Sequence, residues 1–397
     1  MSQKALVFTF VLSGLLLANL QARSTSSAEP SERPRVAVVL PLFLDSLFKG
    51  GAYRYGNSIP KWSMPALEFY HGLRLAADSL TREGVEADIW VIDSRKNGGY
   101  EAAFADPTLK TANLIIAMAQ GSPELKALAE IALAHNIPLI NATYPSDGRV
   151  TGNNRMVILN STLKTHCEGL YRNLQINHST DNLVLITRTG TVENFLKASM
   201  EEAGKNTRSV ALKWTEQVLP DAFTPEQLVA LLDSTRTNTI IGATLDKNFS
   251  LRLIKTIAGM SAKYRVNIMG MPTWDEYALN KAEFKGSTVY FSTPFVSYSA
   301  NAALYNAFNK RFTNILKSKP SDMAYKGYEI VYRYTRTLKD YPTPEAFMEN
   351  INKPAYRMFA DFNVQPVTAA DGTVNYLENK KIYWVKKVDG NIVWVGN

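Results

Sequence analysis

The stretch FYHGLRLAADSLTREGVEADIWVIDSRKNGG, residues 69–99, decides the fold class of this chain. Small and apolar residues recur at helical spacing from residue 73 to residue 80, and Gly84 is expected to end that helix. The apolar run of residues 89–92 then predicts a buried strand, with Asp93 at its carboxyl end. A helix that is followed by such a strand is typical of an α/β fold, in which strands and helices alternate.

The segment VAVVLPL, residues 36–42, predicts a second buried strand upstream of the helix. Two strands joined through a helix form a parallel βαβ unit, and ligands of such sheets bind beyond the carboxyl ends of the strands. Helical patterns fill most gaps between further apolar runs, so the chain is predicted to be α/β throughout. These further strand candidates are residues 114–118, 137–141, 183–187, 210–214, 239–243 and 266–269.

The order and spacing of these segments resemble the type I periplasmic binding proteins, the Leu/Ile/Val-binding type that serves ABC transporters. The resemblance is carried by residues 36–42, 69–80, 113–148, 182–190, 286–294 and 320–333. It implies two Rossmann-like lobes with parallel sheets, joined by a hinge that the chain crosses three times. The length of the chain also fits two lobes.

The crossings are expected near residues 157–161, 289–293 and 359–364. Lobe 1 would then comprise residues 35–157 and 293–360, and lobe 2 residues 158–292 and 361–397. Two segments, 367–376 and 385–395, place an Asp-Gly pair between apolar alternations and predict hairpins that extend lobe 2. The loop Phe43–Pro65 is longer than the family's usual connection, and we expect it to cap or fill the cleft.

The N-terminus predicts a secreted protein of the periplasm or cell envelope. Lys4 precedes an apolar run, residues 5–20, which is typical of a signal peptide cleaved after Ala22 or as late as Ala28, with residues 23–34 as a linker. The alternative is an uncleaved anchor, but the run is shorter than the roughly 20 residues that a spanning helix needs. No cysteine follows the run, so a lipid-modified N-terminus is not expected.

The single cysteine, Cys167, permits no internal disulfide. Its neighbour His166 suggests a nucleophile with a base or a metal pair, but adjacent helical residues point in different directions, and a buried free thiol is the better interpretation. The other histidines stand alone, and no pair of residues has metal-ligand spacing. We therefore expect no metal site and no cofactor.

The resemblance implies that the first lobe receives a ligand carboxylate. Ser122, followed by Pro123, is expected to be the N-cap of a helix whose first N–H groups face an anion. An N-cap without a ligand is the simpler alternative for this serine. The residues that match the family's contacts in this lobe are Ser122, Ala142 and Thr143. Gln120 belongs to the same loop as Ser122 and is a further candidate, and Tyr144 is expected to stack on the ligand or to pack in its turn.

The second lobe departs from the family pattern. Arg188 stands where the family has an aspartate, and it would bind a carboxylate or phosphate unless it is a solvated charge. Asp275 is the leading candidate for the acid that receives a ligand ammonium, with Trp274 as a wall and Asp246 as its rival. Either aspartate would otherwise be a loop or cap residue.

The chain has 44 basic and 36 acidic residues, a net charge of +8. This charge points weakly to an anionic ligand, membrane or wall polymer, although it is dispersed as on a solvated surface, and no nucleic-acid motif is present. The usual catalytic motifs are missing, and two carboxylates of the kind a glycosidase needs are only a remote alternative.

We therefore expect a non-enzymatic protein without catalytic residues. It would bind a small polar solute, an amino acid or similar compound, and deliver it to an inner-membrane ABC permease or a sensor. The alternative is an envelope scaffold or regulator with a degenerate pocket that binds peptidoglycan or a wall-synthesis protein.

Overall fold

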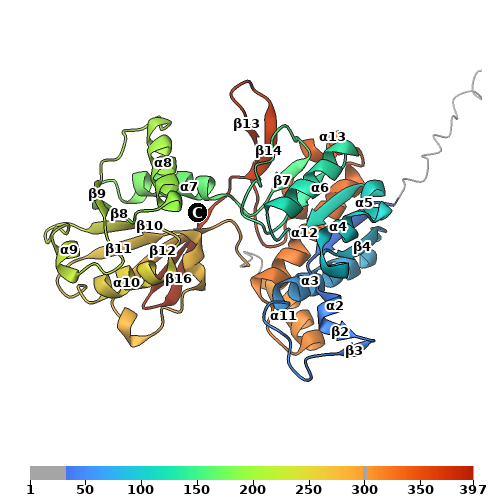
Figure 1. The fold of residues 1–397 in the computed structure, drawn as a ribbon, viewed down its shortest axis with the longest axis horizontal. Helices are drawn as coiled ribbons and strands as arrows, with labels where there is room; N and C mark the ends of the chain where they lie inside the picture. The colour runs from blue at the N-terminus through green and yellow to red at the C-terminus, as the bar shows by residue number, and fades with distance from the viewer. Residues whose placement is uncertain (1–32, 298–301, 397) are drawn as a thin grey trace, which may run out of the picture. The chain divides into compact units, whose positions relative to one another are not determined.

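The computed structural model describes residues 33–297 and 302–396 (Figure 1). The expected signal peptide, both cleavage positions and nearly all of the linker lie outside the described residues. Within these two ranges, none of the helices combines the length and the apolar character needed to cross a membrane.

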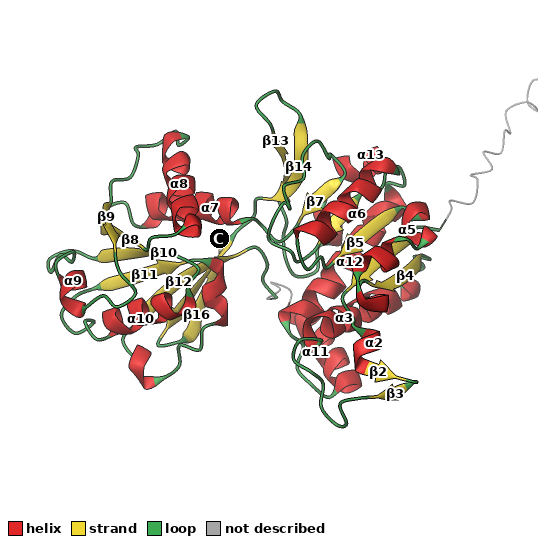
Figure 2. Ribbon diagram, in the orientation of Figure 1, coloured by secondary structure: helices red, strands yellow, loops and turns green. Residues whose placement is uncertain are grey.

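The first lobe is built on a sheet of mostly parallel strands with helices on its faces (Figure 2). The strand order is β13-β14-β7-β6-β5-β1-β4. The strands are β1 (Arg35–Leu40), β4 (Asp88–Asp93), β5 (Leu114–Ala117), β6 (Leu139–Asn141), β7 (Met156–Ile158), β13 (Val364–Thr368) and β14 (Val374–Asn379). Val36 of β1 lies opposite Ile89 on one side and Leu114 on the other, in parallel register. The sequence therefore identified the βαβ unit that joins β1 to β4.

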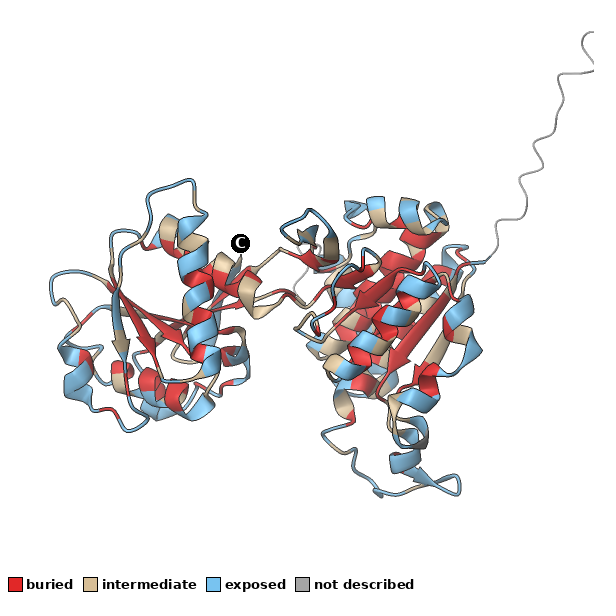
Figure 3. Cartoon of the chain, turned by 45° about the horizontal axis from the view of Figure 1, so that its top comes forward, coloured by how far each residue is buried: buried red, intermediate tan, exposed pale blue. Residues whose placement is uncertain are grey.

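Both faces of this sheet are covered, which explains the continuous apolar run of β1. Val36, Val38 and Leu40 point into one core cluster, and Ala37 and Val39 into another on the opposite face. Figure 3 shows these strands buried behind helices whose outer surfaces are exposed.

The helices of the first lobe come from both ends of the described chain. They are α2 (Leu44–Leu47), α3 (Met64–Arg82), α4 (Tyr100–Phe104), α5 (Pro107–Thr111), α6 (Ser122–Ala134), α11 (Ala302–Leu316), α12 (Asp322–Asp340) and α13 (Pro344–Glu349), with the 3₁₀ turns η1 (Lys96–Gly98) and η4 (Pro354–Tyr356). The loop after β1 also holds a small hairpin, β2 (Phe48–Lys49) and β3 (Ala52–Tyr53).

Helix α3 ends as predicted. Gly84 has a φ of +74°, and the N–H groups of Gly84 and Val85 donate to the carbonyls of Thr81 and Leu80 at 3.1 and 2.9 Å. This pair of bonds is a Schellman motif, in which a left-handed glycine follows the helix.

Helix α3 packs closely against α12 through reciprocal glycines. A Cβ added to Gly72 would lie 2.0 Å from the carbonyl oxygen of Ala324, and one added to Gly327 would lie 2.1 Å from that of Phe69. The two backbones thus approach at positions where only glycine fits.

The second lobe contains another sheet, in the order β16-β15-β12-β11-β10-β8-β9. Its strands are β8 (Asn182–Thr187), β9 (Thr215–Val218), β10 (Asn238–Ala243), β11 (Val266–Gly270), β12 (Thr288–Thr293), β15 (Tyr383–Val388) and β16 (Asn391–Gly396). Its helices are α7 (Leu163–Asn177), α8 (Thr191–Lys205), α9 (Pro225–Val229) and α10 (Lys247–Ala258), with the 3₁₀ turns η2 (Pro272–Glu276) and η3 (Ala282–Phe284). The predicted architecture of two lobes with parallel-dominated sheets is confirmed.

The strand predicted at residues 210–214 is wrong. Val210 is 90% exposed, and the strand forms just downstream as β9, where Thr215 lies opposite Val184. Leu212 and Trp214 pack against the core from a loop, and the N–H of Leu212 donates to the Tyr171 hydroxyl at 2.8 Å.

The third crossing is also misplaced in the prediction. Strands β13 and β14, which flank the first Asp-Gly pair, belong to the first sheet, where Leu377 lies opposite Val157 of β7. The chain therefore crosses at residues 380–382, not near 359–364, and residues 361–379 do not belong to lobe 2. The second hairpin, β15–β16, does extend the second sheet as expected. The first crossing lies at residues 159–162, close to the predicted 157–161. The second follows β12, so the prediction of a crossing at 289–293 is wrong: these residues belong to the second sheet.

Candidate functional site

Asp93 organises the carboxyl edge of the first sheet. Its carboxylate accepts hydrogen bonds from the N–H groups of Leu42, Phe43, Leu44 and Arg95 at 2.8–3.1 Å. Four donors satisfy a carboxylate that is only 8% exposed, so Asp93 holds the loops after β1 and β4 in place. It is a scaffold residue of this edge.

Glu124 plays the same part at the next strand end. Its carboxylate is 3% exposed and accepts the N–H of Gln120 at 2.9 Å and the guanidinium of Arg95 at 2.7 Å. The pair fixes the turn between β5 and α6, which carries Gln120 and Ser122. Sequence reasoning missed this glutamate, although its place in the first helical turn is a known signal for an acid that reaches back to a backbone N–H.

Ser122 is not the N-cap that the sequence predicts. Helix α6 begins at Ser122 itself, Gly121 is the cap residue, and no side chain makes a capping bond. The Ser122 hydroxyl lies 3.1 Å from the hydroxyl of Tyr144 instead. Because a helix leaves its first N–H groups without partners inside the helix, the turn presents donors beside these two hydroxyls.

The loop after β6 is held by Asn141, a residue that the sequence interpretation did not single out. Its side chain donates to the carbonyl of Tyr144 at 2.8 Å and accepts the N–H of Tyr144 at 3.1 Å. Ala142 is 2% exposed, and the carbonyl of Thr143 accepts from the Asn160 side chain. The structure thus brings Ser122 and Tyr144 together at one edge, with Ala142 and Thr143 in the same loop.

Arg188 lies at the carboxyl end of β8, among three carboxylates. Its guanidinium binds Asp221 in a bidentate pair at 2.6 and 3.0 Å, and lies 3.3 Å from Asp246 and 3.7 Å from Glu193. The hydrogen bond with Asp221 raises the pKa of Arg188. The predicted alternatives, an anion receptor or a solvated charge, did not include this cluster, in which an anion would have to displace Asp221.

Asp246 is the N-cap of α10 and accepts the N–H of Phe249 at 2.8 Å. The cap interpretation of this residue is therefore confirmed. Glu193 is the buried member of the cluster, and its carboxylate also accepts a hydrogen bond from the Thr244 hydroxyl at 2.7 Å. The cluster of Arg188, Glu193, Asp221 and Asp246 therefore holds one cation and three acids.

Trp274 does not form a wall of a cleft, and that prediction is wrong. Its side chain is fully buried and fills the space beside Gly270 and Gly242, where added Cβ atoms would lie 2.0 and 2.8 Å from the indole. It stacks on Tyr277 with ring centroids 6.0 Å apart. The missing side chains at these two strand glycines make room for the indole in the core.

Asp275, the next residue, points the other way. Its side chain keeps 51% of its surface exposed, and one carboxylate oxygen lies 3.7 Å from Nζ of Lys387. Partial burial raises the pKa of Asp275, and Lys387 opposes this change. The Lys387 ammonium also donates to the Asp275 carbonyl at 3.0 Å, so this lysine positions the turn.

Within residues 33–297 and 302–396, no group of three or more histidine, cysteine, aspartate and glutamate side chains is arranged to hold a metal ion. Cys167 is a buried free thiol, and burial raises its pKa to about 12. The neighbouring His166 instead pairs with the Ser292 hydroxyl at 2.7 Å, and burial lowers the pKa of His166 to about 4. The side chains at the strand ends are suited to binding polar groups.

Three solved structures illustrate what the chain is similar to. An ABC-type branched-chain amino acid transporter from Rhodopseudomonas palustris has a TM-score of 0.60 at 13% identity, covering 91% of this chain and 94% of that one. A substrate-binding protein from Desulfitobacterium hafniense, in complex with Leu, has a TM-score of 0.56 at 14% identity, with 91% and 99% covered. The LivJ substrate-binding protein from Streptococcus pneumoniae, in complex with isoleucine, has a TM-score of 0.52 at 14% identity, with 92% and 99% covered.

At these identities the likeness concerns the fold alone. No curated protein sequence matches the chain. The family model described as periplasmic binding protein matches residues 68–376, which is most of the chain. This chain belongs to the periplasmic binding protein family.

Proposed function

We propose that the protein captures a small zwitterionic solute, an amino acid or similar compound, between the strand ends of its two lobes. The observation that carries the proposal is the opposite polarity of the two edges. At the first edge, the hydroxyls of Ser122 and Tyr144 accompany the N–H groups at the start of α6, a combination that suits a carboxylate.

The second edge is acidic. Three carboxylates against the one guanidinium of Arg188 leave a net charge of −2, and the half-exposed Asp275 lies on the same edge with its charge balanced by Lys387. Such an edge favours an ammonium group. The family membership and the neighbours named as amino acid transport proteins, two of them with Leu or isoleucine bound, support this ligand class.

The solute would be trapped by closure of the lobes about the hinge and passed to an ABC-type permease or read by a sensor. The family also supports export of the chain to the periplasm or cell envelope, and a binding role in place of catalysis.

Titration calorimetry with the common amino acids tests the proposal. Ser122→Ala should weaken binding while changing the free energy of unfolding by less than about 0.5 kcal/mol, because Ser122 makes no capping bond. Asp275→Asn should also weaken binding. Glu276→Gln is the matched control, since Glu276 is an exposed acid in the same turn. Unchanged affinity in both site variants would refute the placement of the site.

A second candidate function is an envelope scaffold or regulator, and one observation favours it. The loop Phe43–Pro65 carries a chain of ring contacts through Phe48, Tyr53, Tyr55 and Trp62, with Phe48, Tyr55 and Trp62 between 38% and 47% exposed. Exposed apolar clusters of this kind mark interaction surfaces. The loop also lies outside the family match at residues 68–376.

Co-sedimentation with insoluble peptidoglycan separates the two functions. The scaffold function predicts that the protein sediments with the polymer and that Trp62→Ala reduces this, whereas amino acids produce no calorimetric signal. The solute-binding function predicts the reverse.

A further inference from the structure

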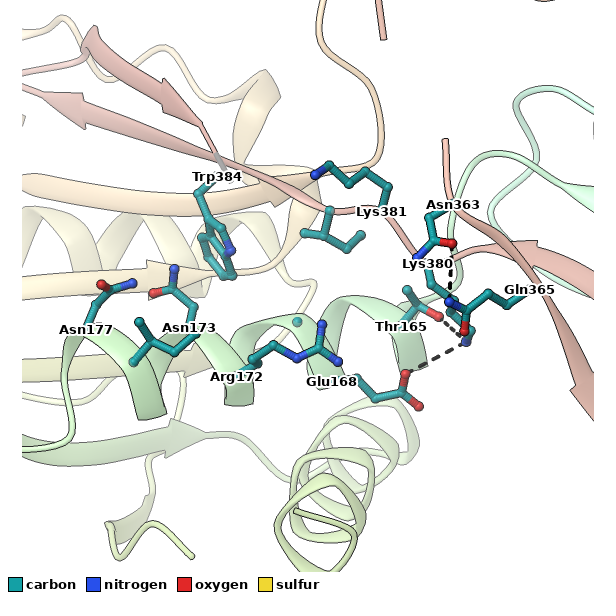
Figure 4. A pocket seen from close by; sticks show the side chains of 13 residues that line it. Thr165, Glu168, Arg172, Asn173, Asn177, Asn363, Gln365, Lys380, Lys381 and Trp384 are labelled. Carbon is teal, nitrogen blue, oxygen red and sulfur yellow. Dashed lines mark hydrogen bonds and ion pairs between the residues drawn. The ribbon is translucent and has the colours of Figure 1, made fainter. Parts of the chain in front are cut away.

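A cavity of about 540 Å³ lies between α7 and the third crossing, residues 380–382 (Figure 4). Its volume falls within the range of small-molecule sites. One side is the outward surface of α7, including Arg172, Asn173 and Ile176, and the other is the crossing with Lys381 and Ile382. None of these residues belongs to the strand-end site, so the cavity is a separate feature of the molecule.

One cation of the cavity, Lys380, is structural. Its ammonium donates to the Thr165 hydroxyl at 2.6 Å and to Glu378 at 2.8 Å, and lies 3.8 Å from Glu168. Glu378 is 1% exposed, and its other oxygen accepts from Thr162 and Thr165. This network fixes the crossing to the start of α7, and Lys380 is not available to a ligand.

Two other cations have no acidic partner among the described residues. In the part of the chain that the structure describes, neither Arg172 nor Lys381 forms a salt bridge, and the Lys381 ammonium has only the Tyr383 ring at 5.4 Å. Glu168 is the one acidic side chain among the described lining residues, and it faces Lys380. In Figure 4, Asn173 lies on the side of α7 that faces Trp384, and Arg172 extends along the helix toward Glu168. A guanidinium so placed binds planar anions through paired N–H groups.

The cavity also has an apolar side. Ile176 is 71% exposed, and Ile382 lines the cavity opposite it. Gly169 of α7 packs against Ile382: a Cβ atom added to Gly169 would lie 3.4 Å from the Ile382 side chain. The helix therefore comes close to the crossing at one end of the cavity, and the apolar surface flanks the charged part.

We propose that this hinge pocket is a second ligand site, specific for a small organic anion that carries an apolar group. The anionic group binds Arg172 and Lys381, the amide of Asn173 donates a further hydrogen bond, and the apolar group covers Ile176 and Ile382. A ligand in this position contacts the crossing itself, so its binding is linked to the conformation of the hinge. The site does not depend on the solute-binding function proposed above.

Calorimetry with benzoate and phenyl phosphate, with benzamide as a neutral control, tests the proposal on the full protein. Both anions should bind in a saturable manner at millimolar concentration or below, and benzamide should not. Arg172→Glu and Lys381→Glu should each weaken binding by about tenfold or more. Arg208→Glu is the matched control, because Arg208 is exposed, lies outside the cavity lining and belongs to the same lobe.

Ile176→Ser provides a test that leaves every charge in place. Residue 176 is exposed, so the variant should fold, and it should weaken benzoate binding while the weaker binding of inorganic phosphate is unchanged. The proposal is overturned if neither anion binds, if benzamide binds as well as benzoate, or if the charge-reversal variants bind normally. It is also overturned if Ser122→Ala or Asp275→Asn abolishes benzoate binding, since the probe would then occupy the strand-end site.

Discussion

Glu329→Gln should remove a pH-dependent part of the stability of the first lobe. Glu329 lies in α12, is fully buried, and accepts the N–H groups of Met358 and Phe359 at 3.0 and 2.6 Å. Arg333, one turn later and also fully buried, lies 3.6 Å from its other oxygen. Burial raises the pKa of Glu329 to about 7, against the opposing effects of Arg333 and the two N–H groups.

The sign follows from proton binding. The ordinary pKa of the carboxyl is 4.5, so between pH 4.5 and about 7 the native state holds a proton that the unfolded chain has lost. The stabilisation from this group is fully present below pH 4.5 and is lost as the pH rises toward 7. Since one pKa unit corresponds to about 1.4 kcal/mol, the loss is about 3 kcal/mol.

Urea unfolding of the wild type and of Glu329→Gln at pH 5 and pH 8 measures this effect. Glutamine keeps the shape and an acceptor for both N–H groups, but it does not ionise. The wild type should lose about 2–3 kcal/mol more than the variant between the two pH values. Glu349→Gln, at an exposed position of α13, should follow the wild type. The same pH dependence in the wild type and Glu329→Gln would refute the reasoning.

Two further predictions concern the cores. Cys167 should resist iodoacetamide in the native protein at pH 8, because the thiol is buried and its pKa is raised to about 12. Reducing agents should not change the melting temperature. Rapid alkylation of the folded protein would contradict this prediction. Gly72→Ala should destabilise the first lobe by about 1–3 kcal/mol in urea unfolding, because the new Cβ would clash with the Ala324 carbonyl. This clash outweighs the helix propensity of alanine, which normally stabilises a helix by about 1 kcal/mol relative to glycine. A stabilised variant would mean that α3 and α12 pack less closely than described.

The sequence predicted those parts of the fold in which a short run of residues is compatible with only one kind of secondary structure. A short apolar run such as VAVVL, covered on both faces, is typical of a parallel strand, and β1, β4, β5, β8, β10 and β11 lie where such runs occur. The helix ending at Gly84 was predictable because the Schellman motif depends on one local glycine.

The two hairpins show where local patterns stop being sufficient. Residues 367–376 and 385–395 carry the same Asp-Gly signal, yet one hairpin joins the first sheet and the other the second. Which sheet a hairpin joins depends on which sheet has an edge strand free to pair with it. Strand β14 pairs with β7, and β15 pairs with β12, and both partners lie far away in the sequence.

The same limit explains the errors at the site. Arg188 pairs with Asp221 and Asp246, which lie on loops after two other strands. The residues next to Arg188 in the sequence therefore do not predict these partners. Trp274 follows a strand and precedes an acid, as expected for a cleft residue, but Gly242 and Gly270 leave space for it in the core. Only the fold reveals these complementary shapes and charges.

The family match separates the strand-end site from two other features of the molecule. The match covers residues 68–376. Lys381, Ile382 and Trp384 lie beyond it, whereas Arg172, Asn173 and Ile176 of the same pocket lie inside it. The loop Phe43–Pro65 lies outside the match at the other end. The strand-end residues from Gln120 to Asp275, by contrast, all fall inside it. Solute capture is thus the property to be compared with the family, whereas the loop Phe43–Pro65 and the third crossing, which lines one side of the hinge pocket, lie outside the matched residues.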